Sequence, residues 1–343
     1  MDLSIIVPVY NVERYIRPCI ESIFRQGLKD SVFEVIIVND GSTDKSMEMI
    51  QDIILQHSNI TIINQENQGL SVARNNGIAK AKGDYILMPD SDDLLIENSL
   101  KPLLDNAIKS QADLIVADFL KLSDEEINKN LSFTQKEFTI KEKNGRQLFL
   151  EDLNPRECFV WRTLYRKNFL IKENLKFYPN IRYQDIPFTH ECYIKAGKCL
   201  RIFKLLNIYR KWPGASTLTF NNTKARDFSI AIAKTWELTY LSGLSPSIVH
   251  KLQEDVWTSF IEMLRLLCHH VKNSRDRYDI IYFLQKQVPE LTFQNGKKQR
   301  LISYLYKNMP HIFITYFYLY ITIIEDHLLP FYYHNIRTLS YKK

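Results

Sequence analysis

GDYILMPDSDD, residues 83–93, places three carboxylates directly after a short apolar stretch. The residues up to Pro89 have the composition of a buried strand, which the proline ends. Burying several anions together is unfavourable unless a cation or a hydrogen-bonding ligand compensates them. Carboxylate oxygens suit Mg²⁺ or Mn²⁺, and these ions typically bridge one or two carboxylates to substrate phosphates. The stretch therefore predicts a metal-diphosphate site at Asp90 and Asp92, with an ordinary solvated Asp-rich turn as the alternative.

Strand-like and helix-like segments alternate through the first 120 residues. Apolar segments typical of strands occupy residues 3–8, 33–39, 60–63, 83–89 and 113–117. Segments with helical patterning lie between them, at residues 12–25, 41–56, 70–82 and 99–110. Repeated strand–helix units with short turns predict an α/β fold, a doubly wound domain with a mixed, mostly parallel sheet. Ligands of such sheets bind beyond the carboxyl ends of the strands, where we find residues 10–11, 39–41, 64–69 and 90–93.

The pattern changes twice in the rest of the chain. Residues 121–143 are polar, charged and weakly patterned, which predicts a loop or an excursion from the fold. A compact region with large apolar anchors, Trp161 among them, follows. From residue 222 onward the strand–turn rhythm is lost and the pattern is helical. We therefore expect an α/β domain over residues 1–221 and an α-helical C-terminal region over residues 222–343.

The composition of the 343 residues is that of a globular protein, with 45% hydrophobic and 24% charged residues. A net charge of +6 permits contact with an anionic membrane or a phosphorylated substrate without demonstrating either. The five cysteines form no Cys-x-x-Cys pair, which is typical of reduced cysteines in the cytosol. No apolar run reaches the ~18–20 residues of a spanning helix, and the first residues do not resemble a signal peptide. We expect a cytoplasmic protein with no nucleic-acid partner.

The turn Asn39–Asp44 follows the second predicted strand and begins a helix, for which Ser42 is a natural N-cap. A capped strand–helix turn is one interpretation of this pattern. In the other, Asp40 accepts a hydrogen bond from an N–H of a nucleotide base while the turn shapes the pocket. Pro8 and Tyr10 end the neighbouring strand, where an aromatic ring could pack beside a uracil-like base or simply against the rim of the sheet.

Arg74 lies within the first turns of the helix predicted at residues 70–82. Its forked guanidinium suits a phosphate, although a surface salt bridge would explain an isolated arginine as well. The combination is more informative than any one residue, because Arg74, Asp40 and the Asp90–Asp92 pair all lie near strand ends of one predicted sheet. Together they predict a nucleotide site.

Four motifs together resemble the successive signatures of family-2 inverting glycosyltransferases. They are VPVYN at residues 7–11, VNDGSTD at 38–44, GLSVARN at 69–75 and PDSDD at 89–93. The resemblance is strong over residues 3–120, looser to residue 217 and absent beyond it. It implies a nucleotide-sugar-binding domain over residues 1–221 with the A-type glycosyltransferase fold, that of nucleotide-diphospho-sugar transferases.

The resemblance also implies roles for individual residues in binding the nucleotide sugar. Asp40 would contact the nucleobase, in a pocket that Pro8 and Tyr10 line. Asn67 and Arg74 would help to hold the nucleotide. These roles belong to the family and are carried over to the residues that match its motifs.

The acidic loop and a later aspartate complete the implied site. Asp90 would contact the ribose or the metal ion, and Asp92 would bind the Mn²⁺ or Mg²⁺ that bridges the diphosphate. FYPNIRYQDIPF, residues 177–188, is similar to the family stretch that ends in Glu-Asp before a helix, in which the Asp is the general base. Asp185 is then the catalytic base, and Gln184 replaces the family's Glu. Asp185 could also be the N-cap of that helix, and the two roles are compatible.

The tail combines an apolar, aromatic stretch at residues 312–324 with basic flanks. The stretch is too short to span a bilayer. Basic flanks beside Tyr and Phe suit a helix that rests on an anionic membrane surface, which would make residues 297–343 a peripheral membrane contact. A buried helix or a homo-oligomer interface is the open alternative.

Together these observations predict a metal-dependent inverting glycosyltransferase of the hexosyl- or N-acetylhexosaminyltransferase class. We expect it to move one sugar from a UDP-sugar to a hydroxyl of a surface polysaccharide or lipid-linked oligosaccharide, at the inner face of the plasma membrane. The Gln-x-x-Arg-Trp signature of processive synthases is missing, which favours single-sugar transfer. Tyr209-Arg210 and residues 216–219 resemble a further family segment that closes over the donor.

Two other functions remain as alternatives. A nucleotidyltransferase would also hold a metal-bound nucleotide on an α/β sheet. Its usual Gly-rich start with Arg and Lys is absent after the first strand, where residues 8–11 are PVYN. A non-catalytic, membrane-associated scaffold could retain the fold, but the carboxylates that it would not need are present.

Overall fold

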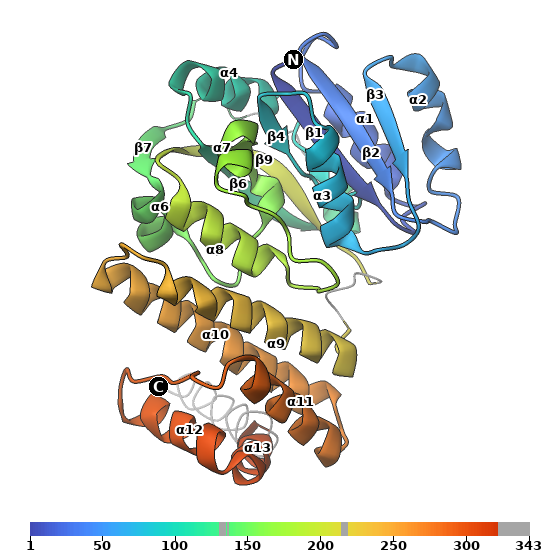
Figure 1. Cartoon of the computed structure of the whole chain (residues 1–343). Helices are drawn as coiled ribbons and strands as arrows, with labels where there is room; N and C mark the ends of the chain where they lie inside the picture. The colour runs from blue at the N-terminus through green and yellow to red at the C-terminus, as the bar shows by residue number, and fades with distance from the viewer. Residues whose placement is uncertain (130–134, 136, 214–218, 322–343) are drawn as a thin grey trace, which may run out of the picture. The chain divides into compact units, whose positions relative to one another are not determined.

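The computed structural model describes residues 1–129, 135, 137–213 and 219–321. The chain divides into two compact units, Met1–Ala215 and Ser216–Lys343. The first unit alternates strands and helices, and the second is helical in its described residues (Figure 1). The pattern placed the boundary after residue 221, where Asn221 caps the first helix of the second unit. The domain limits inferred from the pattern stay a prediction.

In the described residues, nine strands form one mixed sheet in the order β3-β2-β1-β4-β8-β6-β9-β5, and β7 pairs with β9. The strands are β1 (Leu3–Val9), β2 (Phe33–Asn39), β3 (Ile60–Asn64), β4 (Tyr85–Leu87), β5 (Leu94–Leu95), β6 (Leu114–Ser123), β7 (Ile140–Asn144), β8 (Thr163–Arg166) and β9 (Lys198–Lys211). β1 to β4 are mutually parallel, whereas β8 enters antiparallel between β4 and β6. The predicted fold class, with its helical C-terminal region, is confirmed.

Helices connect the strands of the first unit and make up the second. Those of the first unit are α1 (Ile16–Phe24), α2 (Gln51–Gln56), α3 (Leu70–Lys80), α4 (Leu100–Ser110), α5 (Asp124–Ile127), α6 (Gly145–Asp152), α7 (Lys167–Lys172) and α8 (Asp185–Lys195). Those of the second unit are α9 (Asn222–Glu237), α10 (Pro246–His270), α11 (Ser274–Gln287), α12 (Lys297–Asn308) and α13 (Pro310–Leu319).

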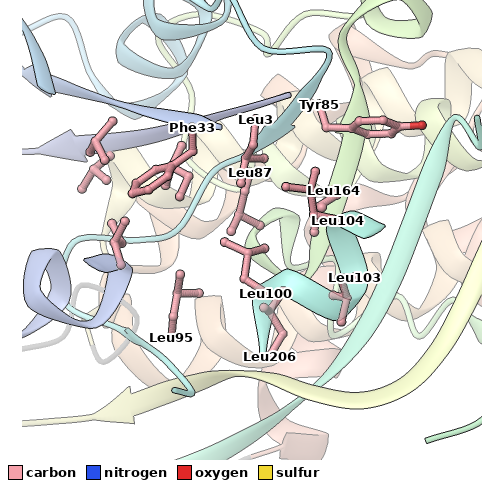
Figure 2. Close-up of a cluster of buried hydrophobic side chains, with 14 of the residues drawn as sticks. Leu3, Phe33, Tyr85, Leu87, Leu95, Leu100, Leu103, Leu104, Leu164 and Leu206 are labelled. Atoms are coloured by element: carbon pink, nitrogen blue, oxygen red, sulfur yellow. The ribbon is translucent and has the colours of Figure 1, made fainter. Parts of the chain in front are cut away.

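Buried apolar side chains on β1 explain why this strand has no polar alternation. All seven of its residues are buried, as expected when helices cover both faces of a parallel sheet. On one face, Leu3 joins Phe33 of β2 and Leu87 of β4 in a cluster that leucines of α4 complete (Figure 2). On the other face, a Cβ at Gly77 of α3 would overlap Ile6, so the glycine allows close helix–strand packing.

Residues 41–50 do not form the first turns of a helix, so the prediction that Ser42 is an N-cap is wrong. A 3₁₀ turn precedes α2, which begins only at Gln51. Polar side chains in this segment hydrogen-bond to the backbone of the loop after β1 instead: Val12 N–H donates to Ser46 Oγ (2.8 Å) and Glu13 N–H to Asp44 Oδ2 (2.9 Å). Such local acceptors compete with helix formation.

Residues 121–143 contain more regular structure than the expected loop. They include the end of β6, the short helix α5 and most of β7. β7 is charged along its length because it pairs with β9 on one side only and is largely exposed. Its sequence therefore lacks the apolar alternation that would have revealed a strand.

The apolar stretch predicted at residues 312–324 overlaps α13 (Pro310–Leu319), and residues 322–324 lie outside the described residues. One side of α13 is buried, with Phe313 at 1% exposure, and the other is open, with Tyr316 at 61%. In the described part of the chain, none of the helices combines the length and apolar character needed to cross a membrane.

Candidate active site

The loops that leave β1 and β2 are held together by reciprocal hydrogen bonds at the carboxyl edge of the sheet. Thr43 N–H donates to Asn11 Oδ1 (2.8 Å), and Lys45 N–H donates to Glu13 Oε2 (2.9 Å). Asn11 has a φ of +51°, a left-handed conformation that Asn tolerates better than most residues. Tyr10 is half exposed at the start of this loop, which these hydrogen bonds hold in place at the rim of the sheet.

Asp40 follows β2 and is almost completely buried, with 3% of its surface exposed. Its Oδ1 accepts hydrogen bonds from Gln65 Nε2 and Gln68 N (both 2.8 Å), and its Oδ2 accepts one from Gly69 N (2.9 Å). Asp40 thereby fixes the loop that leads into α3, and its contact with a nucleobase stays a prediction.

The loop between β3 and α3 also approaches the turn after Asp40 closely. Gly41 has a φ of +73°, and a Cβ on it would lie 2.9 Å from the backbone nitrogen of Asn67. Only glycine fits such an approach without displacing backbone. Asn67 is exposed on this loop, next to the rim that carries Tyr10, while Pro8 is buried within β1.

Arg74 extends from α3 to the acidic loop after β4. It is only 2% exposed, and its guanidinium forms an ion pair with Asp90 Oδ1. The guanidinium carbon lies 5.3 Å from the ring centre of Phe177, within the range of a cation–π contact. A surface salt bridge, the alternative for this arginine, is excluded because Arg74 is buried.

Asp92 and Asp93 are bound to the end of β9. Asp92 Oδ2 accepts a hydrogen bond from Trp212 Nε1 (2.9 Å), and its carbonyl accepts one from Arg210 Nε (2.9 Å). Asp93 is 1% exposed and its Oδ1 accepts from the backbone N–H of Arg210 (2.8 Å). Asp93 Oδ2 has no hydrogen-bond partner among the described residues.

The crowding of these carboxylates disfavours their charged forms. Burial, followed by the neighbouring charges of Asp90 and Asp92, raises the pKa of Asp93 well above its ordinary value. Burial also raises the pKa of Asp90, an effect that Arg74 opposes and Asp92 reinforces. An added cation would reverse this penalty, so the oxygen-rich loop fits a hard divalent ion. Within the described residues, no three His, Cys, Asp or Glu side chains are arranged to hold a metal by themselves.

Asp185 is the first residue of α8, at the end of the segment that the resemblance selected. Gln184 occupies the N-cap position without a side-chain cap, so the alternative that Asp185 itself caps the helix is wrong. Gln184 is buried, and its Oε1 accepts no hydrogen bond in the described part of the chain. Asp185 remains partly exposed, and its role as the base stays a prediction.

Hydrogen bonds to α3 position the segment that carries Asp185. Asn75 Nδ2 donates to the carbonyl of Phe177 (2.8 Å), and Phe177 N–H donates back to Asn75 Oδ1 (3.0 Å). Ser71 Oγ adds a bond to the carbonyl of Ile181 (3.4 Å). The segment that leads into Asp185 is thus anchored to α3, the helix that carries Arg74.

Burial raises the pKa of Asp185 to about 6. The positive charge of Arg74 lowers it and the negative charge of Asp90 raises it further, which places the three groups in one electrostatic neighbourhood. A carboxylate with a pKa near 6 is deprotonated at neutral pH and still a useful base.

The family comparison agrees with this geometry. Residues 4–172 match the model of glycosyl transferase family 2. These residues therefore form a glycosyl transferase family 2 domain. The resemblance inferred from the motifs, and the enzyme class that it implied, are confirmed at this level.

Relatives of this glycosyltransferase domain extend beyond the family match. The uncharacterized glycosyltransferase EpsJ of Bacillus subtilis is 36% identical over 224 residues, which are 63% of this chain and 62% of EpsJ. The glycosyltransferase GlyG of Streptococcus pneumoniae is 28% identical over 310 residues, 86% of this chain and 98% of GlyG. Among solved structures, S. aureus TarS 1–349 superposes with a TM-score of 0.70 at 19% identity, covering 93% of this chain and 91% of that one. TarS thus shares the fold.

Two residues that support the acidic loop of the glycosyltransferase domain, Arg210 and Trp212, were not predicted as site residues. Arg210 pairs with Asp124 as well as binding the loop, and the ring of Trp212 packs 4.8 Å from that of Tyr15. The match at Tyr209-Arg210 was the signal available for the arginine. Of the segment expected to close over the donor, residues 216–218 lie outside the described residues.

Proposed function

We propose that this chain transfers one sugar from a UDP-sugar to a hydroxyl of a glycan or lipid-linked acceptor, with inversion at the anomeric carbon. The carrying observation is that Arg74 and Asp90, which form a buried ion pair, are both close enough to shift the pKa of Asp185, although the three residues are far apart in the sequence. TarS, which shares the fold, has been solved with UDP and with UDP-GlcNAc. That supports a UDP-sugar as the donor here.

Asp185 is the proposed general base. It would accept the proton of the acceptor hydroxyl as that oxygen attacks the anomeric carbon from the face opposite the diphosphate. The new glycosidic C–O bond forms while the C–O bond to the diphosphate breaks, which inverts the configuration. Arg74 would keep Asp90 in place and favour the charged form of Asp185, since the positive charge of Arg74 lowers the pKa of that base.

Asp92 and Asp90 would hold a Mn²⁺ or Mg²⁺ ion. When bound, such an ion supplies positive charge to the departing diphosphate. The fit rests on hard oxygen donors, on the raised pKa of the crowded acids and on the unpartnered Oδ2 of Asp93. The diphosphate would supply further ligands, as is usual for these ions.

Pro8, Tyr10, Asp40 and Asn67 are the proposed surroundings of the nucleotide. Tyr10 and Asn67 are exposed at the rim and available to a ligand. Asp40 would act through the loop that it organises, and through the remaining acceptor capacity of its Oδ2. Because these residues follow β1, β2 and β3, the nucleotide would bind beyond the carboxyl ends of parallel strands.

Slow hydrolysis of a panel of nucleotide sugars, compared between the wild type and Asp185→Asn, tests the proposal. We expect hydrolysis of one UDP-sugar by the wild type, its loss in the variant, and unchanged calorimetric binding of UDP in both. Glu191→Gln, which changes another acid on α8, is the control and should hydrolyse normally. Full activity of Asp185→Asn would refute the assignment of the base.

Calorimetry with UDP and Mn²⁺ separates this function from its alternatives. A non-catalytic scaffold would give no metal-dependent heat. A nucleotidyltransferase would release pyrophosphate from a nucleoside triphosphate, whereas a glycosyltransferase releases UDP from its donor. We favour glycosyl transfer because the family match covers the α/β domain. A lipid-linked acceptor would place the enzyme at the inner face of the plasma membrane.

A further inference from the structure

The last two described helices have one face packed on α10. Phe260 of α10 lies 5.4 Å from the ring of Tyr306 on α12 and 6.2 Å from the ring of Phe313 on α13. Tyr306 and Phe313 are 2% and 1% exposed. The two helices also pack against each other (Figure 1). Their opposite faces are therefore turned away from the core of the second unit.

The outward face of α13 is apolar instead of polar. Ile312, Tyr316 and Leu319 are 56%, 61% and 47% exposed, and their spacing of four and three residues puts them on one side of the helix. An amphipathic helix in water normally presents polar side chains there. Large side chains exposed in a row indicate a surface that binds something apolar.

The outward face of α12 also carries exposed apolar side chains, and it adds positive charge. Leu301 and Tyr304 are 58% and 57% exposed. Lys298 falls on one side of them around the helix, and Arg300 and Lys307 on the other, all exposed. From residue 297 to residue 319 the sequence contains no Asp or Glu. We define the outer stripe as the five exposed apolar residues Leu301, Tyr304, Ile312, Tyr316 and Leu319.

Such a stripe could bind a second copy of this chain or a lipid surface, and its positive charge favours the lipid surface. In a symmetric dimer the same patch meets itself, so Lys298, Arg300 and Lys307 would face their own copies without acids between them. An anionic lipid surface instead offers phosphates to the cations and an acyl boundary to the apolar side chains. Tyr is also favoured at that boundary, where its ring is buried and its hydroxyl stays hydrated.

We propose that the outer stripe docks on an anionic phospholipid membrane, with its apolar side chains in the interface and the flanking cations on the lipid phosphates. The helices lie flat in this arrangement and do not cross the bilayer. The proposal stands on the second unit alone and does not depend on the chemistry of the first.

Vesicle co-sedimentation of the full chain tests it. The probes are vesicles of phosphatidylglycerol with phosphatidylcholine, and of phosphatidylcholine alone. We expect binding to the anionic vesicles that weakens as salt is raised, and much weaker binding to the neutral ones. Lys298→Gln/Lys307→Gln should lower the affinity for anionic vesicles roughly tenfold or more, and Ile312→Ser/Tyr316→Ser by a similar factor.

A matched double variant controls for the loss of exposed apolar surface in general. Leu55 and Ile171 are 80% and 63% exposed on the first unit, so Leu55→Ser/Ile171→Ser should bind vesicles like the wild type. Circular dichroism of each variant establishes that it is folded. Equal binding to neutral and anionic vesicles, or wild-type binding by Ile312→Ser/Tyr316→Ser, overturns the proposal. So does a dimer that this variant dissociates in a protein that binds no vesicles, because the occupant is then a second copy.

Discussion

Asp40 and Asp93 are both buried carboxylates beyond strands of the same mixed sheet, yet their surroundings differ. Asp40 accepts three hydrogen bonds, two of them from backbone N–H groups, and both of its oxygens are used. Asp93 accepts one, has a second oxygen without a partner in the described residues, and lies beside two further acids. The loop after β2 is thus complete without a ligand, whereas the acidic loop gains from a cation.

Asp185 belongs with the acidic loop in this comparison. Like Asp93, it has a pKa that burial raises and that a neighbouring carboxylate raises further. The difference teaches that Asp40 is satisfied by hydrogen bonds from the loop it organises, whereas Asp93 and Asp185 carry a burial penalty that those bonds do not remove. Each prediction below changes one of these acids, or the indole that binds Asp92, and states what should be lost.

The largest effect is expected from Asp185→Asn, because an amide cannot accept the proton of the acceptor. Loss of a general base costs about 10²- to 10⁴-fold in rate. The single-turnover transfer rate with a UDP-sugar measures it. The affinity for UDP should stay within about twofold of wild type, because the substitution removes no proposed contact with the nucleotide.

Asp40→Asn should unfold at a lower urea concentration than the wild type. The amide offers one acceptor oxygen in place of two, so at least one buried N–H is left without a partner, at a cost of about 1–3 kcal/mol. Asp93→Asn is the matched variant in the other loop. An amide there replaces an acid with a strongly raised pKa, so we expect no loss of stability without metal. Equal destabilisation by both would break the comparison.

The pH dependence of Asp185 follows from its raised pKa of about 6. Between its unfolded value of about 3.9 and its folded value, the folded state binds the proton more tightly, so the free energy of unfolding falls as pH rises through this window and then levels. We expect Asp185→Asn to lack this slope and to gain about 1–2 kcal/mol at pH 7, with allowance for solvent screening. Urea unfolding at pH 4 and pH 7 measures it, and the wild-type transfer rate should rise through pH 6.

The smallest effect is expected from Trp212→Phe. An aromatic ring that can pack on Tyr15 is kept, and the N–H that donates to Asp92 is lost. The loss of this hydrogen bond is worth about 1 kcal/mol, or roughly fivefold in the metal-dependent affinity for UDP. Calorimetry of UDP with Mn²⁺ should show weaker binding, while binding of UDP without metal is unchanged. Trp257→Phe in the second unit is the control and should change neither. Unaltered metal-dependent binding in Trp212→Phe would show that the indole does not orient Asp92.

Much of the fold could be predicted from patterns that are local in the sequence. Continuous apolar strands such as β1 and β2 and the small residues of α3 need no knowledge of distant partners. The predictions that failed concern a segment whose side chains compete with helix formation and a strand at the edge of the sheet. Asp44 and Ser46 bind the neighbouring loop in place of a helix turn, and β7 is an edge strand whose charges mask it.

The motifs name candidate site residues, and the structure adds the contacts among them. The motifs selected Asp90, Arg74 and Asp185. Their spacing along the chain could not show that Arg74 is buried in an ion pair with Asp90, or that its positive charge lowers the pKa of Asp185. Trp212 lies about 120 residues from its partner Asp92. Such pairs depend on the order of strands in the sheet, which no short motif encodes.

α3 contacts both parts of the proposed active site, the acidic loop and the segment before Asp185. Arg74 reaches the acidic loop, and its neighbour Asn75 grips the backbone at Phe177, upstream of Asp185. Adjacent residues of one helix would therefore set the distance between the proposed base and the diphosphate of the proposed donor. A shift of α3 would carry both ends of the reaction coordinate together, so their alignment should survive motions of the loops around them.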